Sequence, residues 1–307
     1  MNQLLYFAAH PLRTWANIRY RMPRGASDKR HVFIVGVPRS GTTLLKTLLV
    51  AHPKLGGNDY ESTGVFGFRD IFQYRIGELK PGYVRQLLDQ SGDIVAFYDR
   101  LVASLLERSG KQVFVDKLQV HSYRIAYVQR HFPNAAFLHI VRDGRDCYCS
   151  ALRHPNVRQS DSLARFAAYW ARSVSLPEKI IAPDRLFTVR YEDLTADAEA
   201  SMANLMDFLG IDFVEHQIAV EHYSATTSMK RRKVHENLGR PINAKSQGRW
   251  RRELSEKDNT AFRKLAGEAL AKFGYDDDEP LQASTGAWNR GLGVQANGEA
   301  SNRQGGP

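Results

Sequence analysis

Four short apolar segments stand out along the chain, and none of them alternates regularly with polar residues. They run over His31–Gly36, Gln112–Val115, Ala136–Val141 and Arg185–Arg190. Segments of helical periodicity separate them. Continuous runs of Val, Ile, Leu and Phe divided by helices are typical of a parallel sheet covered on both faces. The pattern therefore predicts a three-layer α/β fold, in which helices flank a central, mostly parallel sheet of four to five strands.

Helical periodicity is clearest between Ile94 and Leu106, where the apolar side chains share one stripe. Pro53 marks the end of the helix that follows the first strand, and Gly210 marks the end of a later one. The pattern predicts further helices over Thr42–Ala51, Ser122–His131, Ser162–Ile181, Asp197–Leu209 and Ser255–Phe273.

The length of 307 residues is enough to close one large core. We expect one domain over residues 31–275. Residues 1–30 form a basic amphipathic segment, which we interpret as a helix that ends before Pro23 and packs on the domain. Peripheral membrane contact through residues 1–24 is the alternative. Residues 276–307 carry an acidic cluster and a Gly-, Asn-, Gln- and Ser-rich tail, for which we expect disorder.

The charge and the apolar runs bear on the location of the protein. The formal net charge is +10, which raises the local concentration of anionic partners without defining the fold. No apolar run approaches the roughly 20 residues of a membrane span, and the first residues lack the pattern of a secretory signal. The sequence therefore predicts a cytoplasmic protein, with a peripheral place at the membrane as the alternative.

The strongest local signal is a glycine-containing turn between the first strand and the next helix. Residues 36–43 read Gly-Val-Pro-Arg-Ser-Gly-Thr-Thr. In this position consecutive backbone N–H groups and a helix N-terminus form a concave anion site. The spacing of Gly36 and Gly41 matches a nucleotide P-loop, but Thr42 replaces the usual lysine and Arg39 lies inside the loop. We therefore predict a P-loop-type fold, whereas the missing lysine argues against an ATPase or kinase.

A second anion site is predicted after the third apolar segment. Arg142 follows that segment directly, and Ser150 comes eight residues later in the next helix. An arginine at the carboxyl end of a strand can meet a phosphate with two N–H groups, and a serine adds a hydroxyl donor. A salt bridge from Arg142 to Asp143 or Asp146 is the structural alternative.

These motifs resemble those of sulfotransferases that use 3'-phosphoadenosine 5'-phosphosulfate (PAPS), in the Golgi and bacterial branch that includes carbohydrate and tyrosylprotein enzymes. Residues 38–45 resemble the loop that binds the 5'-phosphosulfate, and residues 137–150 resemble the segment that holds the 3'-phosphate. Weaker similarities lie at 189–194 and 245–250. The resemblance implies a sulfotransferase domain over residues 31–275. It also implies that the donor is bound by Arg39, Ser40, Gly41, Thr42, Thr43, Arg142, Ser150, Tyr191, Lys245 and Ser246.

Sulfuryl transfer requires cations near the leaving oxygen and a base for the acceptor hydroxyl. Arg39 and Lys117 are the predicted cations, and Lys117 comes just after the second apolar segment, at the same edge of the sheet as the loop. The resemblance implies a glutamate base shortly after the first helix. Glu61 fits that place, with Asp59 as the alternative. Gln119 occupies the position where cytosolic members of the family carry a histidine.

The acceptor is the least determined part of the prediction. We favour a carbohydrate or another small hydroxyl compound and keep a tyrosylprotein as the alternative. Two other classes are a P-loop kinase or NTPase, with Asp116 as an acidic metal partner, and a nucleic-acid-binding module, suggested by the basic run Lys230–Lys233. We predict no nucleic-acid partner and no metal, because the histidines do not cluster at the spacing of metal ligands.

Overall fold

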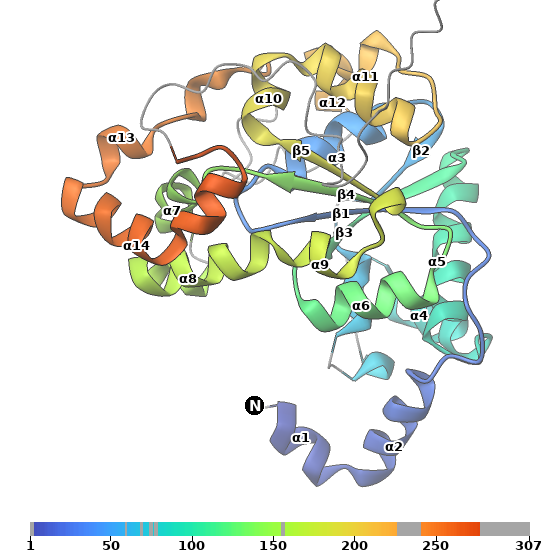
Figure 1. Ribbon diagram of the computed structural model, residues 1–307. Coiled ribbons are helices and arrows are strands. Elements are labelled where there is room, and N and C mark those ends of the chain that lie inside the picture. Colours follow the sequence, from blue (N-terminus) through green and yellow to red (C-terminus); the bar gives the residue numbers. More distant parts are fainter. Residues whose placement is uncertain are drawn as a thin grey trace, which may run out of the picture.

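A sheet of parallel strands lies between two layers of helices in the computed structural model of the chain (Figure 1). The structure describes residues 3–58, 60–67, 70–73, 76, 79–154, 157–225 and 241–276. Three features of the sequence analysis lie outside these residues: the tail beyond Asp276, the basic run Lys230–Lys233 and the alternative base Asp59.

Within the described part of the chain, five strands form this sheet in the order β2-β3-β1-β4-β5, and all neighbouring strands are parallel. The predicted three-layer, P-loop-type α/β fold is confirmed. The prediction ended β3 too early, at Val115, because the charged Asp116 and Lys117 interrupt the apolar run. It missed β2, which is too short to show a pattern. The bounds are β1 His31–Gly36, β2 Leu55–Gly56, β3 Val113–Gln119, β4 Ala136–Val141 and β5 Leu186–Arg190.

Helices connect the strands, and four of the predicted ones, α3, α6, α11 and α14, have bounds that differ by at most one residue from the prediction. The predicted helix Ser162–Ile181 is wrong as one element, since the chain divides at Ser175 into α8 and α9. Pro177 explains the break, because it lacks the N–H group that would continue the helix. The bounds are α3 Thr42–Val50, α4 Pro81–Asp89, α5 Ile94–Ser109, α6 Ser122–His131, α7 Gly144–Leu152, α8 Leu163–Val174, α9 Leu176–Ile180, α10 Tyr191–Ala196, α11 Ala198–Phe208, α12 Val220–Ala225, α13 Trp250–Glu253 and α14 Glu256–Lys272.

Both faces of the sheet are buried, which explains why its strands are apolar without alternation. In β1, Phe33 and Val35 belong to one apolar core, and Val32 and Ile34 belong to the other. The first core also contains residues of α5, α6, α8 and α14, whereas the second contains residues of α3 and α11. Figure 1 shows α6, α8 and α9 on one side of the sheet and α3, α10 and α11 on the other. Because both faces are covered, a ligand can reach the sheet only at the ends of its strands.

The first residues form two helices, α1 Gln3–Ala9 and α2 Pro11–Tyr20, which lie at one end of the molecule in Figure 1. The prediction of a single helix is therefore wrong in its continuity. Pro11 is tolerated as the first residue of α2, where its missing N–H would have no partner within the helix. The same proline disfavours a helical conformation at His10, so α1 ends before it. No helix among the described residues has the length and hydropathy of a membrane span.

Replacing a helical glycine by alanine should have opposite effects on stability at Gly144 and at Gly267. A Cβ atom at Gly144 would lie 2.5 Å from the Trp170 ring and 2.9 Å from Phe262. Gly144→Ala should therefore lower the free energy of unfolding by about 1–3 kcal/mol through overpacking. A Cβ atom at Gly267 in α14 meets no atom within 4 Å, so Gly267→Ala should raise stability by about 0.5–1 kcal/mol. Urea unfolding measures both, and equal losses would contradict the close packing of Gly144.

Candidate active site

The carboxyl ends of β1, β3 and β4 bring the predicted site residues to one edge of the sheet. β1 lies between the other two strands, with Ile34 in register with Lys117 of β3. The phosphate loop, residues 37–41, continues β1, and Arg142 continues β4. Lys117 lies inside β3, whereas the prediction placed it just after the strand. It nevertheless lies at the predicted edge of the sheet. Open α/β sheets bind ligands outside the carboxyl ends of their strands.

The phosphate loop has a conformation that few residues adopt. Arg39 and Gly41 have positive φ angles of 74° and 102°, and Gly41 directly precedes α3. A Cβ atom at Gly36 would lie 2.8 Å from the carbonyl oxygen of Ile140, so only glycine fits there. Among the described residues, the buried hydroxyl of Ser40 has no hydrogen-bond partner. A turn of this kind at the N-terminus of α3 presents unpaired N–H groups to an anion.

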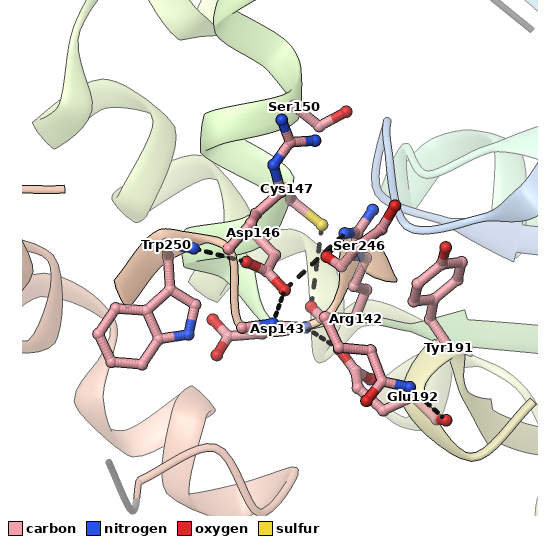
Figure 2. Close-up of polar contacts among 12 residues, drawn as sticks. Arg142, Asp143, Asp146, Cys147, Ser150, Tyr191, Glu192, Ser246 and Trp250 are labelled. Carbon is pink, nitrogen blue, oxygen red and sulfur yellow. Dashed lines mark hydrogen bonds and ion pairs between the residues drawn. The ribbon is translucent and has the colours of Figure 1, made fainter. Parts of the chain in front are cut away.

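Arg39 connects the phosphate loop with the second predicted anion site. Its Nε donates to Ser150 Oγ at 3.0 Å, and its carbonyl oxygen accepts from Arg142 Nη1 at 3.2 Å. Arg142 Nη2 donates to the carbonyl oxygen of Ser246 at 2.5 Å. Figure 2 shows Arg142 beside Ser246 and Tyr191, and its guanidinium lies 4.3 Å from the centroid of the Tyr191 ring. The structure thus brings this part of the predicted donor-binding set together.

Arg142 keeps one polar atom without a partner. Its side chain is only 6% exposed, and its Nε makes no hydrogen bond to any described residue. Asp146, one of the alternative partners, does form an ion pair with Arg142 Nη2, but at 3.8 Å, which is longer than a hydrogen bond and leaves Nε unpaired. Asp143, the other, pairs with Arg145 at 2.8 Å. A buried guanidinium with an unsatisfied N–H fits an anion that offers several oxygens.

Two buried carboxyl groups lie close to Arg142. Asp146 accepts a hydrogen bond from the backbone N–H of Trp250 at 3.0 Å, and Figure 2 shows it between Trp250 and Arg142. Burial raises the pKa of Asp146 to about 6. Burial also raises the pKa of Glu192 to about 7, and Glu192 accepts from the Tyr275 hydroxyl at 2.7 Å. Both groups are easier to protonate than ordinary carboxyl groups, because burial disfavours their charged forms.

A cavity of about 240 Å³ opens beside the phosphate loop, on the β3 side. Lys117 Nζ lies 3.1 Å from Glu61 Oε1, and Gln119 Nε2 donates to Glu61 Oε2 at 3.1 Å. The predicted base and a predicted cation therefore share one space with residues that flank the loop. The lining consists of Ile34, Gly36, Pro38, Thr42, Glu61, Lys117, Leu118, Gln119, Val120, His121, Gln159 and Tyr169.

The charge state of Glu61 is set by its neighbours. Burial alone would raise the pKa of Glu61, but the Lys117 ammonium and the Gln119 amide outweigh it and lower the pKa below its ordinary value. The carboxylate is therefore ionised at neutral pH. An ionised carboxylate in a cavity can accept a proton from a bound hydroxyl group.

A buried ion pair next to this cavity is not among the features predicted from the sequence. Lys46 of α3 lies 3.4 Å from Asp116 of β3, and neither side chain is more than 5% exposed. Asp116 also accepts from the Tyr98 hydroxyl and from the Ser62 N–H, both at 3.1 Å. Asp116 precedes Lys117 in the chain, and Ser62 follows Glu61. The hydrogen bond between Asp116 and Ser62 therefore fixes the positions of Lys117 and Glu61 in the cavity. A lysine among the apolar residues of the predicted helix 42–51 is the signal that could have revealed the pair.

Comparison with known proteins decides the class. The profile of the Sulfotransferase family matches residues 31–215, which is more than half of the chain. The chain belongs to the sulfotransferase family. This confirms the predicted enzyme class, a PAPS-dependent sulfotransferase, and the resemblance on which the prediction was based.

Curated relatives of this sulfotransferase cover most of it at low identity. Protein-tyrosine sulfotransferase 2 of Gallus gallus is 26% identical over 268 residues, which are 80% of this chain and 69% of the relative. Protein-tyrosine sulfotransferase 1 of Danio rerio is 24% identical over 275 residues, which are 81% of this chain and 73% of the relative.

Solved structures share the fold of this sulfotransferase. The sulfotransferase domain from the Synechococcus PCC 7002 olefin synthase has a TM-score of 0.58 at 21% identity, and the match covers 82% of this chain and 98% of that one. A mouse sulfotransferase complexed with PAP has a TM-score of 0.52 at 18% identity, with 87% and 96% covered. Both likenesses support the three-layer architecture.

Some predicted residues of this sulfotransferase are placed differently from the expectation. Arg39, predicted as catalytic and donor-binding, points its guanidinium at Ser150 and does not line the cavity. Lys245 is exposed, and Ser246 contributes its carbonyl oxygen rather than its hydroxyl. Tyr191, by contrast, packs so closely on Gly41 that a Cβ atom there would lie 2.5 Å from its ring. Tyr191 therefore joins the two anion sites.

Breaking the buried ion pair from one side should destabilise the protein more than removing both charges. Lys46→Met leaves Asp116 buried without its ammonium partner and should lower the free energy of unfolding by about 3–5 kcal/mol. The double variant with Lys46→Met and Asp116→Asn should recover at least half of that loss. Urea unfolding of the single and double variants gives the coupling energy. Losses that simply add would contradict a direct interaction between the two side chains.

Proposed function

We propose that this enzyme transfers a sulfuryl group from PAPS to a hydroxyl group of an acceptor that binds in the cavity beside β3. The observation that carries the proposal is that Glu61, Lys117, Gly36 and Thr42 line one cavity. Transfer of a sulfuryl group between two oxygens requires a base, a cation and a site for the donor anion. All three surround this single cavity.

The residues present fit the donor phosphates. We assign the 5'-phosphosulfate to backbone N–H groups of the phosphate loop and to the hydroxyl groups of Ser40 and Thr42. Pro38 has no N–H, and the N–H of Ser40 donates to the carbonyl oxygen of Val37 at 3.1 Å, so these two are not among them. We assign the 3'-phosphate to Arg142 and Ser150, because the unsatisfied Nε of Arg142 and the hydroxyl of Ser150 are donors suited to it. Arg39, which contacts both Ser150 and Arg142, belongs in this proposal to the phosphate sites rather than to the leaving oxygen beside the cavity.

The proposed chemistry gives Glu61 and Lys117 complementary tasks. Glu61 takes the proton of the acceptor hydroxyl while the acceptor oxygen forms its bond to sulfur and the bond from sulfur to the phosphate oxygen breaks. Lys117 stabilises the negative charge that develops on the leaving oxygen. Gln119 holds the Glu61 carboxylate in place through its hydrogen bond.

We propose that the acceptor presents its hydroxyl on a ring-sized group, as the cavity of about 240 Å³ suggests. A carbohydrate or another small hydroxyl compound is the first candidate. Tyrosine is the second candidate, and the names of the chicken and zebrafish relatives, both protein-tyrosine sulfotransferases, favour it. Tyr169 in the lining offers a ring face to either kind of acceptor.

A transfer assay separates these candidates. The full chain is incubated with radiolabelled PAPS and with sugars, phenols and tyrosine peptides in parallel, and the products are weighed by mass spectrometry. A gain of one sulfonate on peptides alone selects the tyrosylprotein candidate, and a gain on sugars alone selects the carbohydrate candidate. Turnover of ATP with Mg²⁺ and no use of PAPS would contradict the proposal as a whole.

Glu61→Gln should lower kcat by about 100-fold or more, because the amide keeps the shape of the side chain but cannot take the proton. The affinity for 3'-phosphoadenosine 5'-phosphate should change little. Glu107→Gln, which alters an exposed acid on α5, is the matched control and should turn over as the parent does. Near-normal turnover of Glu61→Gln would exclude Glu61 as the base and leave Asp59 to be tested.

Arg142→Gln should weaken the binding of 3'-phosphoadenosine 5'-phosphate by about 10- to 100-fold, as expected for lost hydrogen bonds to a charged group. Binding of adenosine 5'-phosphate, which lacks the 3'-phosphate, should be nearly unchanged. Titration calorimetry with both nucleotides on both proteins measures the difference. Equal weakening for the two nucleotides would remove the assignment of Arg142 to the 3'-phosphate.

A further inference from the structure

Helices α1 and α2 contact the rest of the molecule mainly through side chains that carry polar groups, and Tyr20 also packs its ring in the first apolar core. Asp70 accepts hydrogen bonds from Tyr6 at 2.8 Å and from Arg13 and Asn17 at 2.9 Å. Asn17 and Tyr20 are the buried residues of α2. This arrangement is the reverse of an ordinary surface helix, which buries its apolar stripe and exposes its polar side.

The apolar side of these helices consequently faces solvent. Leu12 is 85% exposed and Trp15 is 61% exposed. At the period of an α-helix, Leu12, Trp15 and Ile18 fall within an arc of about 120°, opposite the buried side of α2. Of the eight large apolar side chains that are exposed in the described part of the chain, five lie in this segment. We refer to these five as the apolar face: Leu5, Leu12, Trp15, Ile18 and Met22.

Positive charge accompanies the apolar face. The first 27 residues contain Arg13, Arg19, Arg21 and Arg24 and no Asp or Glu. Arg19 falls in the same arc as Trp15, and its guanidinium lies 5.3 Å from the centroid of the Trp15 ring. Apolar and aromatic side chains next to arginines are typical of helices that lie in the interface of an anionic bilayer.

We propose that α1 and α2 dock the enzyme on the surface of an anionic bilayer. The apolar face enters the boundary between headgroups and acyl chains, and Arg19 and Arg24, both exposed, meet the lipid phosphates. A bilayer surface offers apolar contact and negative charge together. A second copy of the chain would instead bring the same arginines face to face across a symmetric contact, which is unfavourable. None of these residues lines the cavity, so docking and sulfuryl transfer use different surfaces.

Trp15 reports the docking directly. Two other tryptophans, Trp170 and Trp250, are buried, and the fourth is removed by Trp288→Phe. The full chain with this change is titrated with vesicles of phosphatidylcholine and phosphatidylglycerol. The emission of Trp15 should shift to the blue, and lipids brominated on the acyl chains should quench it. Vesicles of phosphatidylcholine alone should bind at least about 10-fold more weakly, because each arginine near the surface loses its electrostatic attraction.

Matched variants distinguish the effect of removing the apolar face from the effect of removing exposed leucines elsewhere. Leu12→Ser, Trp15→Ser and Ile18→Ser together should weaken co-sedimentation with the anionic vesicles by roughly 100-fold. The control combines Leu152→Ser with Leu265→Ser, two exposed positions elsewhere, and should sediment as the parent does. Circular dichroism and light scattering report the fold and the oligomeric state of each variant.

Vesicle binding that survives the triple change, or Trp15 emission that does not move, overturns the proposal. A dimer in solution that becomes a monomer in the triple variant without any vesicle binding also overturns it, because a second copy then covers the apolar face. Transfer to a soluble acceptor should be the same in the parent and the triple variant. Failure of the docking proposal is therefore distinguishable from failure of the proposed function.

Discussion

The parallel pairing of β1 with β3 and β4 is the constraint on which the site depends. Parallel strands end at the same edge of a sheet, so the loop after β1, Lys117 of β3 and Arg142 after β4 become neighbours although they are distant in the sequence. Helices cover both faces of the sheet, and its strands are mostly apolar for that reason, with Asp116 and Lys117 of β3 among the charged exceptions. The predicted anion sites and the cavity lie where the strands run out, close to the buried pair of Lys46 and Asp116.

Buried charges around that edge are held by fixed partners. Lys46 forms an ion pair with Asp116, which also accepts a hydrogen bond from the Tyr98 hydroxyl. Asp146 accepts a hydrogen bond from the backbone N–H of Trp250. This contact holds the start of α13 near Arg142. A buried charge is unfavourable unless it is paired and hydrogen-bonded, so few alternative positions are open to these side chains. Groups that are already oriented stabilise developing charge without first having to reorganise.

Local patterns were enough to predict four of the five strands, the turn after β1 and the place of Arg142 at the end of β4, because each depends on a few consecutive residues. The direction of a long side chain does not follow from such a pattern. Arg39 could extend to either anion site from the loop, and the contact with Ser150, which decides between them, comes from a helix beyond β4. The packing side of α2 depends on Asp70, far along the chain from Asn17. Charges at Asp116 and Lys117 suggested the end of a strand that in fact continues through them.

Lys117 is shared in the proposed reaction between Glu61, its partner in this structure, and the departing phosphate oxygen. One ammonium cannot neutralise two anions fully, so occupancy of the donor site and the proton affinity of Glu61 are thermodynamically linked. A donor that attracts Lys117 makes Glu61 a stronger base at the moment when a base is needed. By reciprocity, an enzyme that has taken up a proton on Glu61 holds the donor more tightly. In the proposed reaction, the 3.1 Å contact between Lys117 and Glu61 therefore keeps the proton affinity of Glu61 low until the donor has arrived.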